Sequence, residues 1–219
     1  MTLAVPTDKE LVDYAAATYL PDAKPFISDL DSAIQVFVTA RSDGLNIIAI
    51  EGTHNALGWA LDFFALTMED QEGVNHPTLG FLHAGFYAAA LAVLSRLTPI
   101  AARPYAICGH SLGAALALML GALLIDDGTA PVKIGAFAPP KCGGDQFVKV
   151  AASVPLCAYR FGLDPVPLVP LALPTFPYRQ VQLVELAAPT REPDIFAYHS
   201  IGNYVSGVTA LNKTPSLAT

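Results

Sequence analysis

Residues 104–120, PYAICGHSLGAALALML, place a serine between two glycines where the chain pattern changes sharply. An apolar run typical of a strand ends at Cys108, and an apolar run typical of a helix begins at Leu112. Between them, residues 109–113 form the G-x-S-x-G pattern, which exposes a serine on a tight strand-to-helix turn. The alternative is a serine that caps a helix between incidental glycines. The dipole of the helix favours negative charge that develops on a hydroxyl oxygen at its N-terminus, so the pattern indicates Ser111 as a nucleophile.

A serine nucleophile needs a general base, and the base needs a carboxylate that orients it. In proteins with this turn, the three residues follow along the chain in the order serine, carboxylate, histidine. His199 is the one histidine after Ser111, and this order excludes the other four, His54, His76, His83 and His110. We expect the His110 side chain to turn away from the serine hydroxyl, and His83 to be a core histidine or to lie beside the site.

Asp164 is the best-placed carboxylate because it directly follows the predicted strand 155–162 and is fixed by Pro165. A turn residue before proline is its alternative interpretation. The other carboxylates between Ser111 and His199 are less well placed. Asp126 and Asp127 end the helix that follows the serine, and Asp145 begins a predicted surface helix. Glu185 lies in a predicted edge strand, and Glu192 and Asp194 are very near His199 in sequence.

The elements that position these residues follow from periodicity and capping signals. Thr7 and Glu10 form a capping box that begins a helix through Leu20. Further helices are expected at 55–66, 80–97, 112–125, 145–153 and 198–211, and strands at 34–40, 45–51, 105–108, 131–137, 155–162 and 178–186. Strands that alternate with helices predict one α/β domain over residues 1–219, with a mostly parallel sheet and helices on both faces.

The composition excludes several classes of protein. Hydrophobic residues make up 53% of the 219 residues and charged residues 14%, which excludes a disordered chain. A net charge of −7, with 12 lysines and arginines spread thinly, argues against a nucleic-acid partner. The same charge gives no attraction to anionic membranes.

The chain carries no predicted membrane or export segment. Charged residues near the N-terminus interrupt any signal-peptide core, and the apolar run 112–125 is shorter than the roughly 20 residues that a spanning helix needs. We therefore expect a cytoplasmic protein, or one exported by a signal-less route, with no transmembrane segment. The three cysteines, Cys108, Cys142 and Cys157, lack metal-ligand spacing and are expected to be buried free thiols.

Four segments, CGHSLGAALA, GLDPVPLVP, LHAGFYAA and IEGTHNALGWALDF, together resemble the class 3 triacylglycerol lipases, the α/β-hydrolase family that includes the fungal lipases. The resemblance runs from about residue 34 to residue 204. It implies an α/β-hydrolase fold and a triad of Ser111, Asp164 and His199. It also implies an oxyanion hole formed by the backbone N–H groups of Thr53 and Leu112.

The same resemblance implies a short lid at about residues 54–66, in which Trp59 and Asp62 match a tryptophan and an aspartate of the family. The buried face of an amphipathic helix is the alternative interpretation of Trp59. Two departures stand out: Glu51 replaces a frequent arginine, and Ala114 replaces the usual second glycine.

The expected function is that of a serine carboxylic-ester hydrolase, a lipase that cleaves acylglycerol esters through an acyl-enzyme. Its partner would be a lipid or ester substrate, at a lipid–water interface, and its chemistry requires no metal or cofactor. A short-chain or phospholipid esterase shares the same machinery. A non-catalytic binding module on a hydrolase fold is the alternative from another class.

Overall fold

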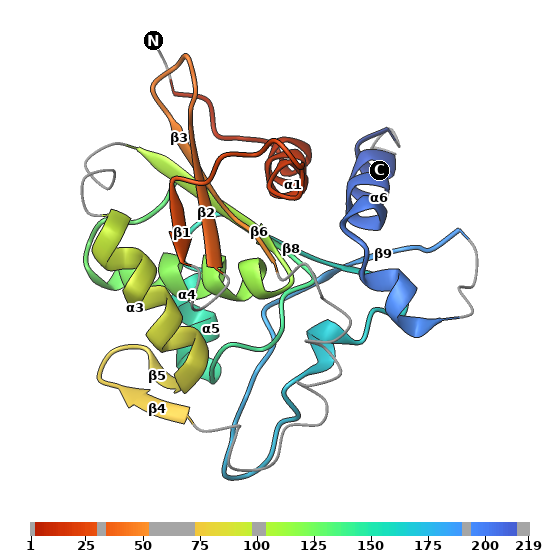
Figure 1. The fold of residues 1–219 in the computed structure, drawn as a ribbon. Coiled ribbons are helices and arrows are strands. Elements are labelled where there is room, and N and C mark those ends of the chain that lie inside the picture. The colour runs from red at the N-terminus through yellow and green to blue at the C-terminus, as the bar shows by residue number, and fades with distance from the viewer. Residues whose placement is uncertain (1–2, 30–33, 53–72, 98–103, 190–193, 214–219) are drawn as a thin grey trace, which may run out of the picture.

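A computed structural model describes residues 3–29, 34–52, 73–97, 104–189 and 194–213. Within these ranges seven strands form one sheet in the order β1-β2-β3-β6-β7-β8-β9 (Figure 1). The strands β1, β2 and β3 are antiparallel neighbours, and the pairs from β3 to β9 are parallel. Their bounds are β1 Ile27–Asp29, β2 Ile34–Ala40, β3 Asn46–Ile50, β6 Tyr105–His110, β7 Lys133–Phe137, β8 Leu156–Phe161 and β9 Val184–Leu186.

Helices cover both faces of this sheet (Figure 1). One face carries α1 (Asp8–Ala17) and α6 (Ile201–Lys213), which lie side by side although they come from opposite ends of the chain. The other face carries α3 (Ala84–Leu97), α4 (Leu112–Asp126) and α5 (Asp145–Ala151). This arrangement confirms the predicted fold class, a mostly parallel sheet with helices on both faces.

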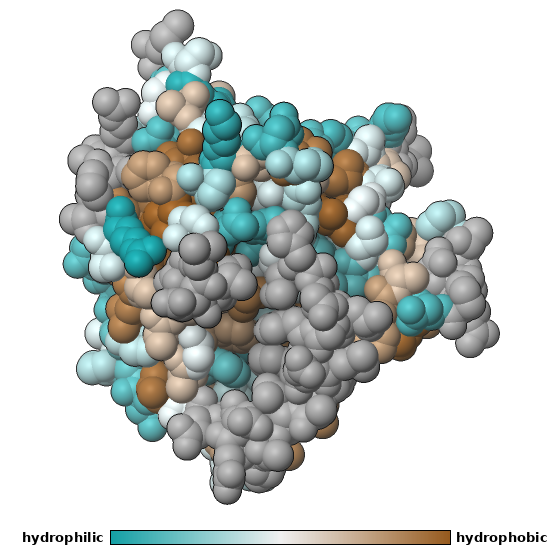
Figure 2. Space-filling model, in the orientation of Figure 1, coloured by the Kyte–Doolittle hydropathy of each residue, from teal (hydrophilic) through white to brown (hydrophobic). Residues whose placement is uncertain are grey.

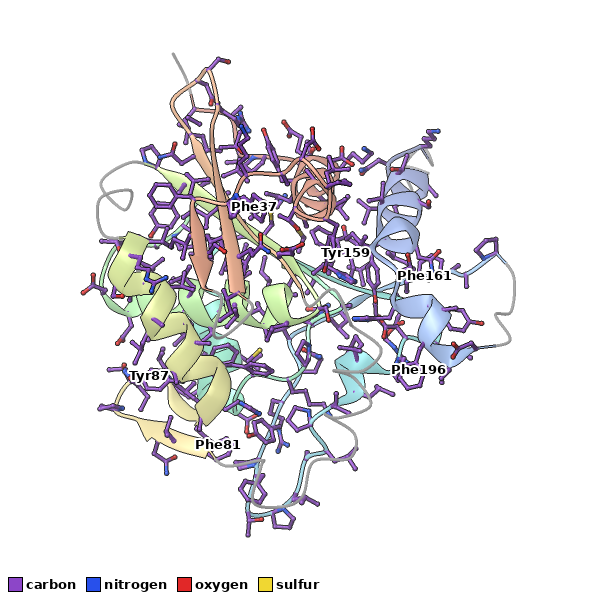
Figure 3. All side chains as sticks on the ribbon, viewed as in Figure 1. Phe37, Phe81, Tyr87, Tyr159, Phe161 and Phe196 are labelled. Carbon is purple, nitrogen blue, oxygen red and sulfur yellow. The ribbon has the colours of Figure 1, made fainter. Side chains whose placement is uncertain are left out.

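The helix α4 is apolar on all sides, which is the pattern of a fully enclosed helix. Every residue from Gly113 to Leu124 is buried, because α4 lies between the sheet and the neighbouring helices α3 and α5. On the opposite face Leu11 and Tyr204 belong to one buried cluster that joins α1, α6 and the sheet. Figure 3 shows Tyr159 and Phe161 near the end of β8, on the side towards α6. Apolar packing on both faces holds the sheet in place, and the site residues lie at the ends of its strands.

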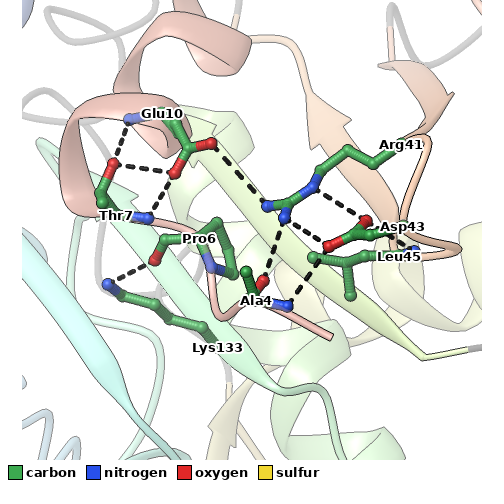
Figure 4. A network of polar contacts seen from close by, with 8 residues as sticks. All are labelled: Ala4, Pro6, Thr7, Glu10, Arg41, Asp43, Leu45 and Lys133. Carbon is green, nitrogen blue, oxygen red and sulfur yellow. Dashed lines mark hydrogen bonds and ion pairs between the residues drawn. The ribbon is translucent and has the colours of Figure 1, made fainter. Parts of the chain in front are cut away.

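A polar network fixes the start of α1 (Figure 4). The predicted capping box is present: the Thr7 hydroxyl accepts the Glu10 N–H, and the Glu10 carboxylate accepts the Thr7 N–H. Arg41 ties this corner to the turn between β2 and β3, since it donates to the Ala4 carbonyl and pairs with Asp43 at 2.6 Å. The first helix is therefore joined to the sheet by hydrogen bonds as well as by packing.

Most of the predicted elements are confirmed, with small shifts at their ends. The helix α1 ends at Ala17, three residues before the expected end. The helix α4 extends one residue further than predicted, and β6 continues to His110, two residues beyond the expected Cys108. The helix expected at residues 55–66 lies outside the described residues. The three cysteines are free and buried, as expected.

Three predicted elements are wrong in part. Gly80–His83 is a strand, β5, that pairs with β4 (Gly73–His76), and α3 begins only at Ala84. The expected strand 178–186 is reduced to β9 at its last three residues, which pair in parallel with β8. The expected helix 198–211 is divided into a short 3-10 helix, η3 (Ile195–His199), and α6, because the Ser200 backbone is extended. A second 3-10 helix, η2 (Val166–Leu168), follows Asp164.

Candidate active site

Ser111 occupies the turn between β6 and α4, with backbone dihedrals of φ 59° and ψ −124°. A positive φ is uncommon for a residue with a side chain and costs conformational energy. The surrounding backbone holds it there: the Ser111 N–H donates to the Phe137 carbonyl at 2.9 Å, and the Ser111 carbonyl accepts the Ala115 N–H at 3.1 Å. Such strain at a single serine is typical of a functional residue.

Both flanking glycines are required by close backbone contacts. A Cβ atom at Gly109 would lie 2.2 Å from the Gly113 carbonyl oxygen. A Cβ atom at Gly113 would lie 2.1 Å from the Ile50 carbonyl oxygen. Neither neighbour is a flexible side chain, so no other residue fits at either position without a shift of the backbone. The steric interpretation of the G-x-S-x-G pattern thus agrees with the contacts around the turn.

The structure brings Ser111, His199 and Asp164 into one hydrogen-bonded line. His199 Nε2 lies 2.8 Å from Ser111 Oγ, and His199 Nδ1 lies 2.8 Å from Asp164 Oδ2. A carboxylate only accepts, so Nδ1 carries the ring hydrogen and Nε2 is left to accept the serine hydroxyl. All three side chains are buried, with Ser111 and Asp164 fully enclosed. This is the arrangement in which an imidazole can remove the serine proton.

The Asp164 carboxylate receives two further hydrogen bonds. Val166 N–H donates to Oδ1 at 2.9 Å, and the Tyr204 hydroxyl donates to Oδ2 at 2.5 Å. Burial, reinforced by the adjacent Asp164 charge, raises the pKa of Tyr204 well above its ordinary value, so the hydroxyl stays a donor. Arg160 Nε donates to the Asp164 backbone carbonyl at 2.9 Å. These donors compensate the cost of burying the carboxylate.

The competing carboxylates with described partners lie elsewhere. Asp194 accepts the Phe196 N–H at 2.9 Å and so caps η3. Asp145 pairs with Arg179 at 3.0 Å on the surface. Glu185 lies 3.8 Å from an Arg160 nitrogen. Asp126 and Asp127 stand at the end of α4, far along the helix from Ser111, and Glu192 lies outside the described residues.

The excluded histidines also have other surroundings. His83 stacks on Phe86 at a ring distance of 4.2 Å, and burial lowers its pKa to about 4. His76 Nδ1 accepts the backbone N–H of Leu79 at 3.3 Å in the β4–β5 turn. His110 forms hydrogen bonds to Tyr19 and to the His199 carbonyl through its two ring nitrogens. His54 lies outside the described residues.

The two expected oxyanion-hole donors differ in what the structure describes. Leu112 is the first residue of α4, and backbone N–H groups in the first turn of a helix have no partner within the helix. Thr53 lies outside the described residues, as do Trp59, Asp62 and the whole expected lid segment 54–66. Gly52, directly before Thr53, approaches the nucleophile so closely that a Cβ atom there would lie 3.2 Å from Ser111 Cβ.

Sequence reasoning missed two tyrosines that contact this site, Tyr204 and Tyr19. The sequence has eight tyrosines, several of them in or next to predicted helices. Position in the sequence alone therefore does not distinguish Tyr19 and Tyr204 from the others. The available signal is chemical: a buried tyrosine hydroxyl requires a hydrogen-bond partner, and polar partners are scarce in so apolar a chain.

Among the described residues, no group of three or more histidine, cysteine, aspartate or glutamate side chains is arranged to hold a metal ion. Of the helices within the same ranges, none combines the length and apolarity that a membrane crossing demands.

The fold and the Ser–His–Asp contacts define a serine hydrolase of the α/β-hydrolase fold. The family model described as Lipase (class 3) matches residues 47–173, more than half of the chain. The chain therefore belongs to the class 3 lipase family, which confirms the resemblance seen in its motifs.

Several solved lipase structures are similar in fold. A mono- and diacylglycerol lipase from Aspergillus oryzae aligns with a TM-score of 0.65 and 20% identity, over 93% of this chain and 97% of that one. Lipase II from Rhizopus niveus aligns with a TM-score of 0.62 and 18% identity, over 89% of each chain. The Rhizomucor miehei triacylglyceride lipase aligns with a TM-score of 0.57 and 19% identity, over 82% of this chain and 77% of that one. No curated protein matches the chain.

Proposed function

We propose that the protein hydrolyses the ester bonds of acylglycerols through an acyl-enzyme on Ser111, with His199 as general base and Asp164 as its orienting carboxylate. The observation that carries this proposal is the pair of 2.8 Å contacts that His199 makes to Ser111 Oγ and to Asp164 Oδ2. Residues 1–219 would act as one hydrolase domain with a lid at about residues 54–66.

Acylation comes first. His199 Nε2 takes the proton from Ser111 Oγ while that oxygen attacks the acyl carbonyl carbon, and the carbonyl electron pair moves onto its oxygen. The N–H groups of Leu112 and Thr53 would stabilise this oxyanion, and each such donor is worth about 2.7–4 kcal/mol of barrier. When the intermediate collapses, the C–O bond to the alcohol breaks and His199 gives its proton to the leaving oxygen.

Deacylation repeats these steps with water. His199 removes one proton from water as the oxygen attacks the acyl carbon. When the second tetrahedral intermediate collapses, the bond between the acyl carbon and Ser111 Oγ breaks, the carboxylic acid leaves, and His199 gives its proton to Ser111 Oγ. Throughout, Asp164 holds the Nδ1–H tautomer and stabilises the imidazolium that forms twice in the cycle.

A lipid substrate is supported by the family and by the surface near the site. Four large apolar side chains are exposed on the segments that carry Asp164 and His199: Leu163, Leu168, Leu171 and Ile195. Exposed apolar side chains that gather around a site favour contact with an apolar ligand or a lipid surface. On the face viewed in Figure 2, hydrophobic and hydrophilic residues are interspersed.

Two measurements test this proposal. The purified protein should react with a fluorophosphonate probe and should hydrolyse p-nitrophenyl esters of increasing chain length. Ser111→Ala should lose labelling and about 10⁴–10⁶-fold of the turnover, with the fold intact because the substitution is small. More than a few per cent of residual activity in the pure variant would contradict the assignment of the nucleophile.

The chain-length panel separates the remaining alternatives. Activity confined to short soluble esters would indicate an esterase rather than a lipase, and cleavage of phospholipid in preference to acylglycerol would indicate a phospholipase. A wild-type protein that neither labels nor hydrolyses any ester would be a binding module on a hydrolase fold.

A further inference from the structure

Tyr19, directly after the end of α1, places its side chain between two strand ends of the site. Its hydroxyl oxygen accepts the Gly52 N–H at 3.1 Å, just beyond the end of β3. The same hydroxyl lies 2.9 Å from His110 Nδ1, at the end of β6. The Tyr19 and His110 rings meet edge to face, with their centroids 5.9 Å apart. One side chain from the segment after α1 thus contacts His110, at the end of β6, and Gly52, just beyond the end of β3.

The direction of each hydrogen bond in this group follows from the chemistry of its members. Burial, and then repulsion from a charged His199, lowers the pKa of His110 far below its ordinary value, so the ring is neutral. His110 Nε2 lies 2.9 Å from the His199 carbonyl oxygen, which only accepts, so Nε2 carries the hydrogen. His110 Nδ1 must therefore accept, and the Tyr19 O–H donates to it.

Tyr19 remains a donor because burial raises the pKa of its hydroxyl. A continuous series of hydrogen bonds therefore joins Gly52 N–H to Tyr19 and Tyr19 O–H to His110. The Nε2–H of His110 completes the series at the carbonyl of His199. Every polar atom in the series has a partner of the right kind, which makes the geometry specific.

One end of this series lies at the backbone of the proposed base, and the other end lies next to an expected oxyanion-hole donor. His199 is the base, and the His110 ring lies 4.8 Å from its ring. Gly52 is the residue before Thr53 and is enclosed: a Cβ atom there would lie 2.3 Å from the Tyr19 hydroxyl and 2.6 Å from the His110 carbonyl oxygen. The separation between the base and the strand that leads to the oxyanion hole therefore depends on Tyr19 and His110.

We propose that Tyr19 and His110 are positioning residues, which set the backbone of His199 and of Gly52 relative to Ser111. This inference rests on the proposed function of that triad. Tyr19 is suited to the role because α1 is fixed at its other end by the network in Figure 4 and by Asp8, which contacts Lys133 at 2.5 Å. Neither residue touches the reacting atoms, so each acts through the groups that it holds.

Tyr19→Phe tests the proposal because it keeps the ring and removes only the hydroxyl. We expect kcat to fall about 10- to 100-fold, the loss that a small misplacement of catalytic groups causes, with KM within about twofold of the wild type. Tyr14→Phe is the matched control, since it makes the same change at a tyrosine of α1 that is also partly buried. It should leave both constants near their wild-type values.

If Tyr19 had only a structural role, Tyr19→Phe would lower Tm but leave kcat unchanged at temperatures well below Tm. This result would overturn the proposal. Equal losses of kcat in Tyr19→Phe and Tyr14→Phe would overturn it as well. If Tyr19→Phe does not fold, His110→Phe serves instead: it keeps an aromatic ring but can neither accept from Tyr19 nor donate to the His199 carbonyl. An unchanged kcat in that folded variant overturns the proposal. Inactive wild-type protein would instead contradict the proposed function itself.

Discussion

Asp164 shows how much of the site depends on single hydrogen bonds. Its carboxylate accepts from His199, Val166 and Tyr204, and its burial is complete. A buried carboxylate with three donors has one orientation, and this orientation selects the histidine tautomer. The proposed base therefore depends on a residue that never touches the substrate.

Asp164→Asn should lower kcat by about 10⁴-fold, by analogy with the aspartate-to-asparagine change that the serine proteases provide. The amide keeps the shape of the side chain but favours the wrong imidazole tautomer. Steady-state kinetics on a soluble ester would measure this loss. Asp194→Asn is the matched control, because asparagine can replace aspartate as the cap of η3. Greater sensitivity at Asp194 than at Asp164 would exclude the proposed triad.

Sequence reasoning reached the residues of the triad but not the two tyrosines, and the difference has a physical reason. Ser111 lies in a local G-x-S-x-G pattern that can be recognised from five residues, although only Gly109 is required by a local contact, with Gly113, and Gly113 is required by contact with Ile50. The order of the triad follows from the topology of the sheet. Tyr19 acts on Gly52 and His110, which are far away in sequence. Contacts of that kind depend on how α1 docks, which no local pattern encodes.

At the scale of elements, the errors fall where two periodicities coincide. Residues 80–83 fit the start of an apolar helix as well as a short strand, and pairing with 73–76 decides for the strand. Gly80 adopts a φ of +71° in the turn, which favours a hairpin over a helix. In Figure 3, Phe81 marks this hairpin and Tyr87 the helix beside it. Such choices are made by tertiary pairing rather than by propensity.

The docking of α1 leads to a prediction about acid stability. Burial raises the pKa of Asp8, but hydrogen bonds from Lys133 and Tyr159 outweigh it and hold the pKa below its ordinary value. A lowered pKa in the folded state contributes stability that is present above the unfolded pKa and is lost as the pH falls through the folded pKa. Because the pair is partly exposed, this contribution is below about 1 kcal/mol.

Asp8→Asn should therefore have a lower Tm than the wild type near neutral pH, and the two values should converge as the pH falls below the ordinary aspartate pKa of 3.8. Differential scanning calorimetry across this range would measure the effect. Asp22→Asn, which changes an exposed carboxylate in the loop after α1, should alter Tm little at either pH. A constant Tm difference between wild type and Asp8→Asn at all pH values would show that the Asp8 charge plays no part.

At the scale of the whole molecule, a net charge of −7 makes electrostatic attraction an implausible route to a lipid surface. Apolar contact would then supply the proposed binding to a lipid surface. The exposed side chains Leu168 and Leu171, after Asp164, and Ile195, before His199, are available for it. Burial of one such side chain stabilises binding by up to about 1.5–3 kcal/mol.

The expected lid gives a prediction at this scale. Trp59→Ala should reduce the rise in long-chain ester hydrolysis above the solubility limit while it spares short soluble esters, because an aromatic ring gains up to about 3 kcal/mol on burial at an apolar surface. Rates measured on both sides of that limit would show the effect. Phe26→Ala removes an exposed aromatic ring next to β1, at the opposite edge of the sheet from β9, and should change neither rate. Equal effects of Trp59→Ala on both substrates would identify Trp59 as a core residue.

The side-by-side docking of α1 and α6 has a consequence for biosynthesis. The ribosome makes α1 before the strands of the sheet, whereas His199, which contacts Ser111, and Tyr204, which contacts Asp164, belong to the last two described helices. Strands β3, β6, β7 and β8 can pair earlier, since all of them precede residue 162. A nascent chain can therefore build most of its sheet while its nucleophile still lacks a base. The proposed hydrolysis must therefore wait until η3 and α6 have docked on the sheet.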